Sequence, residues 1–76
     1  MDNLYYLHFR DKVSQQILDA LSDEGASIQP VFETSFYVAT DLSFSSMKHI
    51  IKTSPFVKQC NLLKVKGNSQ FFTVSE

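Results

Sequence analysis

The stretch SIQPVFETSFYVATDLSFSSMKHII, residues 27–51, decides the fold. It begins with two extended segments, residues 27–33 and 34–40, which are rich in β-branched and aromatic side chains. We predict that they form a hairpin that turns at residues 33–35. Pro30 is compatible with this assignment if its strand lies at an edge of the sheet or carries a bulge.

The same stretch ends in a predicted helix. Ser43 is suited to be its N-cap, and Leu42 and Met47 stand at the two positions of a hydrophobic staple. Pro55 ends the helix, because the residue before a proline is driven out of the helical region. The side chains that we expect to face inward are spaced as one helical stripe: Met47, Ile50 and Ile51.

Working outward towards the amino terminus, the sequence NLYYLHF at residues 3–9 predicts a buried strand, because it is aromatic and too short for a stable helix. A helix is expected to follow, with Asp11 as a possible N-cap and Gly25 as its C-terminal stop. The predicted inner stripe of this helix consists of apolar residues at helical spacing: Val13, Ile17, Ala20 and Leu21.

Working outward towards the carboxyl terminus, residues 57–66 predict a further strand, with Lys64 and Lys66 on its outer side. The Gly-Asn pair at 67–68 is typical of a two-residue hairpin turn. Residues 70–74 (QFFTV) would then form a fifth strand. The predicted fold is α+β and ferredoxin-like, βαββαβ, with both helices on one face of an antiparallel sheet; the fifth strand has no obvious place in it.

Length and composition favour one small globular domain, residues 1–76. The chain is 43% hydrophobic and 20% charged, and its single cysteine, Cys60, excludes an internal disulfide. An acid, Asp2, stands where a signal peptide needs basic residues, and no apolar run reaches the about 20 residues of a membrane span. We therefore expect a cytoplasmic protein that has no membrane partner.

Self-association is the expected source of additional burial. Residues 3–9 carry large apolar side chains on both alternating sides, which predicts that the sheet face without helices is also partly covered. Phe71 and Phe72 must face opposite ways on a strand, so one sheet face cannot bury both. We predict a homodimer whose interface uses residues of the fifth strand: Phe71, Phe72 and Val74.

Charge is unevenly distributed along the chain. Residues 1–41 hold two cations and seven acids, whereas residues 42–75 hold five lysines and no acid. These lysines could bind phosphates, form ordinary solvated surfaces, or meet the acidic half of another copy. The pI near 6.0 is far from that of a dedicated nucleic-acid binder. The candidate residues for a partner or nucleic acid are Lys48, Lys52, Lys58, Lys64 and Lys66.

The sequence contains no pattern typical of catalysis, of a cofactor site or of a small-molecule substrate site. His8 and His49 are far apart in sequence and lack the spacing of metal ligands, so no metal site is predicted. We expect His8 at a partly buried strand position and His49 on the exposed side of the second helix.

The junction formed by Thr40, Leu42 and Ser43, followed by a short helix and a strand, resembles the small CRISPR-associated adaptation nuclease superfamily, especially its SinR-like and GhoS-type antitoxin relatives. The resemblance implies a ferredoxin-like fold whose last strand pairs across a homodimer. Nuclease members carry a metal-binding aspartate at the end of the first strand, where this chain has Phe9, while Asp11 comes two residues later.

Three functions remain open at this point. The leading one is a non-catalytic, homodimeric regulator that binds an unidentified protein or RNA, in the manner of an antitoxin or an inhibitor. The second is a metal-dependent nuclease in which Asp11 and its symmetry mate are the catalytic candidates. The third is a non-catalytic nucleic-acid-binding protein that uses the lysines.

Overall fold

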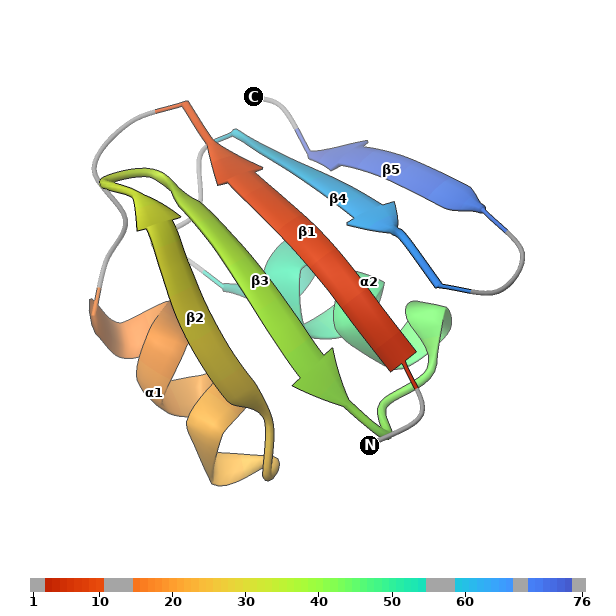
Figure 1. Ribbon diagram of the computed structural model, residues 1–76, viewed down its shortest axis with the longest axis horizontal. Coiled ribbons are helices and arrows are strands. Elements are labelled where there is room, and N and C mark those ends of the chain that lie inside the picture. The colour runs from red at the N-terminus through yellow and green to blue at the C-terminus, as the bar shows by residue number, and fades with distance from the viewer. Residues whose placement is uncertain (1–2, 11–14, 55–58, 67–68, 75–76) are drawn as a thin grey trace.

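The computed structural model describes residues 3–10, 15–54, 59–66 and 69–74. Its five strands form one antiparallel sheet in the order β2-β3-β1-β4-β5 (Figure 1). The predicted α+β, ferredoxin-like arrangement is confirmed, with the fifth strand added at the edge beside β4. The elements, in chain order, are β1 (Asn3–Phe9), α1 (Gln15–Asp23), β2 (Ser27–Phe32), β3 (Ser35–Thr40), α2 (Phe44–Thr53), β4 (Cys60–Lys64) and β5 (Gln70–Val74).

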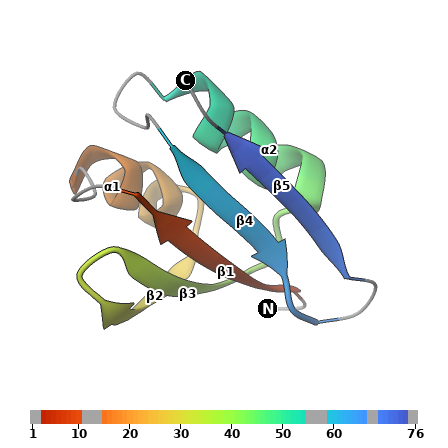
Figure 2. The same ribbon diagram turned by 90° about the horizontal axis from the view of Figure 1, so that it is seen from above.

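Both helices lie on one side of the sheet, as Figure 2 shows. We call this side the covered face and the opposite side the open face. The core fills the space between the helices and the covered face, where apolar side chains are removed from water. Its buried members are Tyr5, Leu7, Phe9, Ile17, Leu21, Phe36, Val38, Met47, Ile51, Cys60 and Leu62.

The central strand β1 shows how alternation divides the two faces. Tyr5 is fully buried, and its hydroxyl donates a hydrogen bond of 2.7 Å to the carbonyl oxygen of Leu42. Tyr6, the next residue, points to the open face and is only half-buried. His8 lies on the open face too and is exposed, so the predicted partly buried position was wrong. No described helix covers that side of β1.

Two predicted helix boundaries are confirmed by their hydrogen bonds. The backbone N–H of Ser46 donates to Oγ of Ser43 over 3.1 Å, which is the N-cap contact of α2. After α1, Gly25 adopts a φ of 84°, and the N–H of Ala26 donates to the carbonyl of Leu21 over 3.1 Å. This is a Schellman motif, in which glycine is favoured at the residue of positive φ.

The inner stripe of α1 differs from the prediction in one member. Ile17 and Leu21 are buried, but Ala20 is exposed, and Leu18 packs against the core instead. Ala20 lies on the side of α1 that faces α2, whereas Leu18 lies on the other flank of the stripe. The predicted residues 11–14, including Asp11 and Val13, lie outside the described residues.

Of the predicted strand 57–66, the structure shows β4 at Cys60–Lys64. Residues 57–58 and the predicted turn at 67–68 lie outside the described residues. Leu62 is buried on the covered face, so Lys64, two residues later, lies on that same side and not on the outer one as predicted. The predicted fifth strand is confirmed at residues 70–74, where it pairs with β4 of its own chain. None of the helices in the described segments is long and apolar enough to span a membrane.

Candidate binding surface

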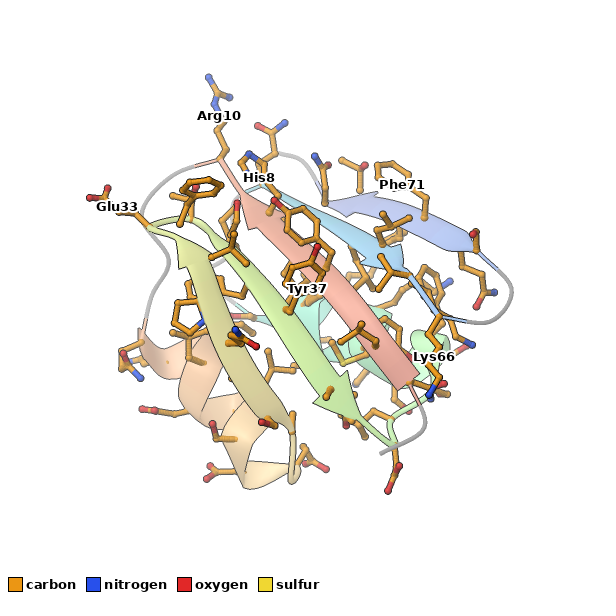
Figure 3. The ribbon with its side chains drawn as sticks, viewed as in Figure 1. His8, Arg10, Glu33, Tyr37, Lys66 and Phe71 are labelled. Atoms are coloured by element: carbon orange, nitrogen blue, oxygen red, sulfur yellow. The ribbon has the colours of Figure 1, made fainter. Side chains whose placement is uncertain are left out.

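A row of aromatic and aliphatic side chains crosses the open face at right angles to the strands. Tyr37 of β3 pairs with Tyr6 of β1, Tyr6 pairs with Leu63 of β4, and Leu63 pairs with Phe71 of β5. We call Tyr37, Tyr6, Leu63 and Phe71 the aromatic row. Figure 3 labels Tyr37 and Phe71, whose exposed fractions are 40% and 63%. The ring centroids of Tyr6 and Tyr37 lie 5.2 Å apart.

A second, polar row runs parallel to the aromatic row. Ser35, His8, Asn61 and Thr73 occupy adjacent strands in register. Nδ1 of His8 and Oγ of Ser35 share a hydrogen bond of 2.8 Å, and Oγ1 of Thr73 donates to Oδ1 of Asn61 over 3.0 Å. These contacts hold the side chains of the polar row in fixed orientations beside the aromatic row.

A polar pocket of about 350 Å³ adjoins the end of the polar row, and its lining residues are His8, Arg10, Gln59 and Asn61. Nη1 of Arg10 donates a hydrogen bond of 3.1 Å to Oε1 of Gln59, and the Arg10 backbone N–H donates to the Gln59 carbonyl over 3.2 Å. A guanidinium carries five N–H donors, and the side-chain contact uses one of them. The pocket is therefore equipped to receive an anionic group.

The charged side chains near the open face stand at its periphery. Figure 3 shows Arg10 beyond the end of β1, Glu33 at the turn between β2 and β3, and Lys66 beyond β4. Phe32, beside Glu33, has 73% of its surface exposed, and it follows a register shift in the pairing of β2 with β3.

The structure does not gather the predicted lysines into one surface. Nζ of Lys48 lies 5.4 Å from the centroid of the Phe72 ring, between α2 and β5. Lys52 is exposed on α2, Lys64 lies on the covered side of β4, and Lys66 follows β4. Lys58 lies outside the described residues. Lys48 and Lys52 therefore belong to the helix layer, and Lys66 is the described lysine that borders the open face.

The residues predicted for a dimer interface divide between the two faces. Phe72 pairs with Leu62 and packs against the core, whereas Phe71 lies on the open face. Val74 pairs with Cys60 at the end of β5. The expectation that the two phenylalanines face opposite ways is confirmed.

Cys60 is the group whose ionisation differs most from its ordinary behaviour among the described residues. Burial raises the pKa of its thiol to about 12, and a backbone hydrogen bond at His8 offsets a part of that rise. Burial also raises the pKa of Tyr5. At neutral pH the Cys60 thiol is therefore protonated, which makes it a poor nucleophile.

No three His, Cys, Asp or Glu side chains within the described ranges lie close enough together to hold a metal ion. His49 is exposed on α2, as predicted. The catalytic candidate Asp11 lies outside the described residues. Ser35 has a histidine neighbour, but only 2% of its surface is exposed, which keeps substrates from its hydroxyl.

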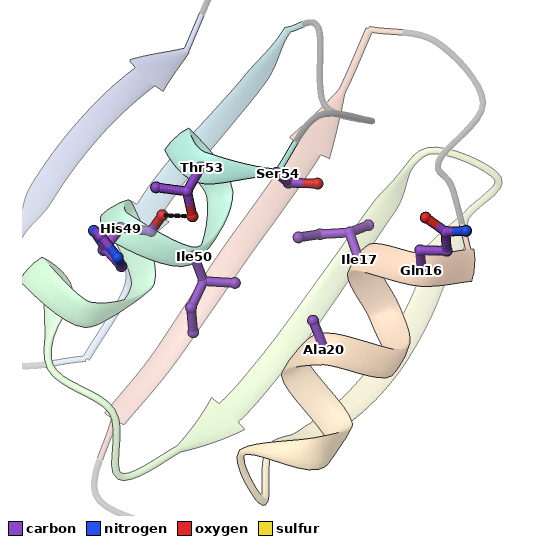
Figure 4. Close-up of a pocket in the computed structure, with 7 residues that line it drawn as sticks. All are labelled: Gln16, Ile17, Ala20, His49, Ile50, Thr53 and Ser54. Atoms are coloured by element: carbon purple, nitrogen blue, oxygen red, sulfur yellow. Dashed lines mark hydrogen bonds between the residues drawn. The ribbon is translucent and has the colours of Figure 1, made fainter.

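A second concave region lies on the other side of the molecule, between α1 and α2 (Figure 4). Its volume is about 410 Å³, and Thr53 stabilises one wall by donating a hydrogen bond of 2.7 Å to the His49 carbonyl. The groove is open and mainly apolar. Its lining residues are Gln16, Ile17, Ala20, His49, Ile50, Thr53 and Ser54.

No family model, curated protein or solved structure matches this chain. The candidate surface is thus defined by geometry alone. The aromatic row was not predicted, although its signal is present in the sequence: Tyr6 and His8 alternate with the buried residues of β1, and Tyr37 alternates with those of β3. Which of these residues would be neighbours depended on the register between the strands.

Proposed function

We propose that this chain is a non-catalytic binding protein that contacts another macromolecule through the open face of its sheet. The observation that carries the proposal is the aromatic row, in which Tyr37 and Phe71 expose large apolar surfaces at the two ends and half-buried apolar side chains connect them. Contiguous exposed apolar surface is uncommon on monomeric proteins and marks interaction sites. The adjoining polar row and polar pocket supply directional hydrogen bonds for specificity.

A binding role fits the open face better than a catalytic one. The Ser35 hydroxyl is buried and the His8 ring is engaged with it. Cys60 lies in the core on the covered face, where its thiol is held in the neutral form. The groove between α1 and α2 is a weaker candidate, because its apolar wall includes core residues such as Ile17 that already serve packing.

Photocrosslinking tests the proposal without knowledge of the partner. A photoreactive p-benzoylphenylalanine is placed at position 71 on the open face or, as a matched control, at position 52 on the exposed side of α2. After irradiation of cells that produce each variant, we expect crosslinked species heavier or lighter than a dimer of this chain at position 71 and few at position 52; the dimer itself is not counted. Crosslinks at position 52 alone, or at neither position, contradict the proposal.

We propose in addition that the chain forms a homodimer through the outer edge of β5. The two edge strands differ: β2 carries Pro30 and a register shift, which both discourage pairing with a further strand. The β5 sequence QFFTV has neither a proline nor a charge. Pairing of β5 with β5 of a second copy would place the same surface on both sides of a two-fold axis.

Light scattering tests the dimer. We expect the wild type to have twice the mass of the chain, Thr73→Lys to shift the mass towards the monomer, and Gln29→Lys on the opposite edge to leave the dimer intact. A charge on an edge strand opposes pairing because the added strand would have to cover it. A monomeric wild type at about 0.1 mM, the weak end of specific association, would contradict the dimer.

A further inference from the structure

We propose that the open face binds single-stranded RNA, with unpaired bases stacked on the aromatic row and a phosphate held in the polar pocket beside Arg10. This inference rests on the proposed function and names the partner class of the same surface.

Stacking is the first part of the argument. Tyr37 and Phe71 are 40% and 63% exposed, and no described helix or strand lies over either ring on the open face. Each base has an apolar face that stacks on such rings, and removing one aromatic ring typically weakens binding by about 5- to 150-fold. Single strands present their bases for this contact, whereas a duplex hides them.

The distance between the stacking rings and the anion site suits a short strand of RNA. Tyr6, His8 and Arg10 alternate along β1 on one side, and residues two apart on a strand are separated by about 6.7 Å. Arg10 is therefore about 13 Å along the sheet from the aromatic row, with the polar row between them. A strand that crosses the face from Tyr6 towards Arg10 would meet rings, hydrogen-bonding groups and a guanidinium in that order.

The size of the face favours a slim ligand over a globular one. Five strands at about 4.8 Å spacing, each 5 to 7 residues long, give a face of about 500 Å². A stable protein interface buries about 800 Å² on each partner. The open face of one copy thus falls short of such an interface, but it is wide enough for a few nucleotides.

Charge supports the same ligand. Asp19 and Asp23 belong to α1, on the covered side of the sheet, and Glu33 stands at one corner of the open face. Arg10 and Lys66 stand at its periphery. Arginine is well suited to phosphate, because its planar fork can donate two hydrogen bonds to one group. Because only two cations are engaged, the affinity should fall with rising salt concentration, with a small slope of log K against log salt.

The polar row gives the reason to choose RNA over DNA. His8, Asn61 and Thr73 place hydrogen-bonding atoms between the stacking rings and the anion site. The 2′-hydroxyl of ribose donates and accepts hydrogen bonds, and it is the group by which proteins distinguish RNA from DNA. We therefore expect single-stranded RNA to bind more tightly than the same DNA sequence.

Fluorescence anisotropy with a labelled octamer of uridine tests the proposal. We expect the wild type to bind it, and Phe71→Ala to lose about fivefold or more in affinity, the lower range for loss of a stacking ring. Arg10→Gln should weaken binding and reduce the slope of log K against log salt by about 0.7. The matched control is Lys52→Ala, which removes an exposed cation from the helix layer and should leave affinity and slope unchanged. Circular dichroism establishes that each variant is folded.

Several outcomes would overturn the RNA proposal. The first is the absence of wild-type binding at 0.1 mM protein. The second is an affinity for a uridine–adenosine duplex or for single-stranded DNA that equals the affinity for the uridine octamer. The third is an equal loss of affinity in Phe71→Ala and Lys52→Ala. The photocrosslinks separate this failure from failure of the proposed function. Crosslinks at position 71 that resist ribonuclease and do not join two copies of this chain, with no ribonuclease-sensitive crosslink beside them, would leave the open face as a binding surface but exclude RNA as its ligand.

Discussion

The two faces of the sheet are built from the same strands and nevertheless differ in almost every physical respect. On β4, Leu62 is fully buried under the helices, whereas the adjacent Leu63 lies half-buried in the aromatic row. On β5, Phe72 packs against the core and Phe71 is 63% exposed. Stability is therefore concentrated on one face, and the other face is available for recognition at little cost to folding.

The largest expected effect comes from the two leucines of β4. Leu62→Ala should lower the free energy of unfolding by about 3 kcal/mol, because it removes buried methyl groups and leaves a cavity. Leu63→Ala should lower it by less than about 1 kcal/mol. Urea denaturation monitored by circular dichroism measures both values. Similar losses of unfolding free energy in the two variants would mean that side chains on the open face contribute as much to stability as those in the core.

The two phenylalanines of β5 give the next contrast. We expect Phe72→Ala to cost about 2 kcal/mol, from lost packing and from the lost contact with the Lys48 ammonium, 5.4 Å from the ring centroid. Phe71→Ala should cost less than about 0.5 kcal/mol, as for an ordinary surface position. The same denaturation experiment applies. A larger loss for Phe71 than for Phe72 would reverse our assignment of the two sides of β5.

Alkaline pH sharpens the contrast through Cys60 on the covered face. Its folded-state pKa is about 12, against an ordinary value of 9.0, so between these pH values the unfolded chain loses the thiol proton while the folded chain keeps it. This difference favours unfolding. The contribution of Cys60 to stability is complete below pH 9 and falls by about 1.4 kcal/mol for each pH unit above it.

The measurement for Cys60 is the difference in unfolding free energy between the wild type and Cys60→Ala, followed from pH 8 to 10.5. Subtraction removes the titrations that both proteins share. A difference that stays constant across this range would show that the Cys60 thiol is reached by water in the folded chain.

The smallest effect concerns the open face alone. The Tyr6 and Tyr37 rings lie 5.2 Å apart, and a double-mutant cycle with Tyr6→Ala and Tyr37→Ala should give a coupling energy of about 0.5 to 1 kcal/mol. Thermal or urea unfolding of the four proteins supplies the cycle. A coupling near zero would indicate that the two rings do not form a shared platform in solution.

Local signals predicted the elements well. The N-cap at Ser43, the stop at Gly25 and the strands at residues 3–9 and 70–74 were all confirmed, because each depends on a few neighbouring residues. The inner stripe of α1 was predicted less well. Whether Leu18 or Ala20 packs inward depends on how the helix is rotated on the sheet, which its own sequence does not specify.

The candidate surface was predicted poorly. The lysines were predicted as a binding site because they cluster along the chain. In the fold, Lys48 and Lys52 lie in the helix layer and Lys64 lies on the covered side of β4. The polar pocket could not be foreseen either. It joins the end of β1 with the residues that begin β4, which are about fifty positions apart in sequence.

By itself, the sequence determined the order of strands and helices, the N-cap at Ser43 and the stop at Gly25, and the alternation that gives each strand one apolar and one mixed side. These properties follow from interactions between residues that are near in the chain. Only the tertiary structure decided which side the helices cover, where β5 attaches, and that Tyr37, Tyr6, Leu63 and Phe71 stand in one row. The register between strands sets those neighbours, and register is fixed by packing of the whole sheet on its core.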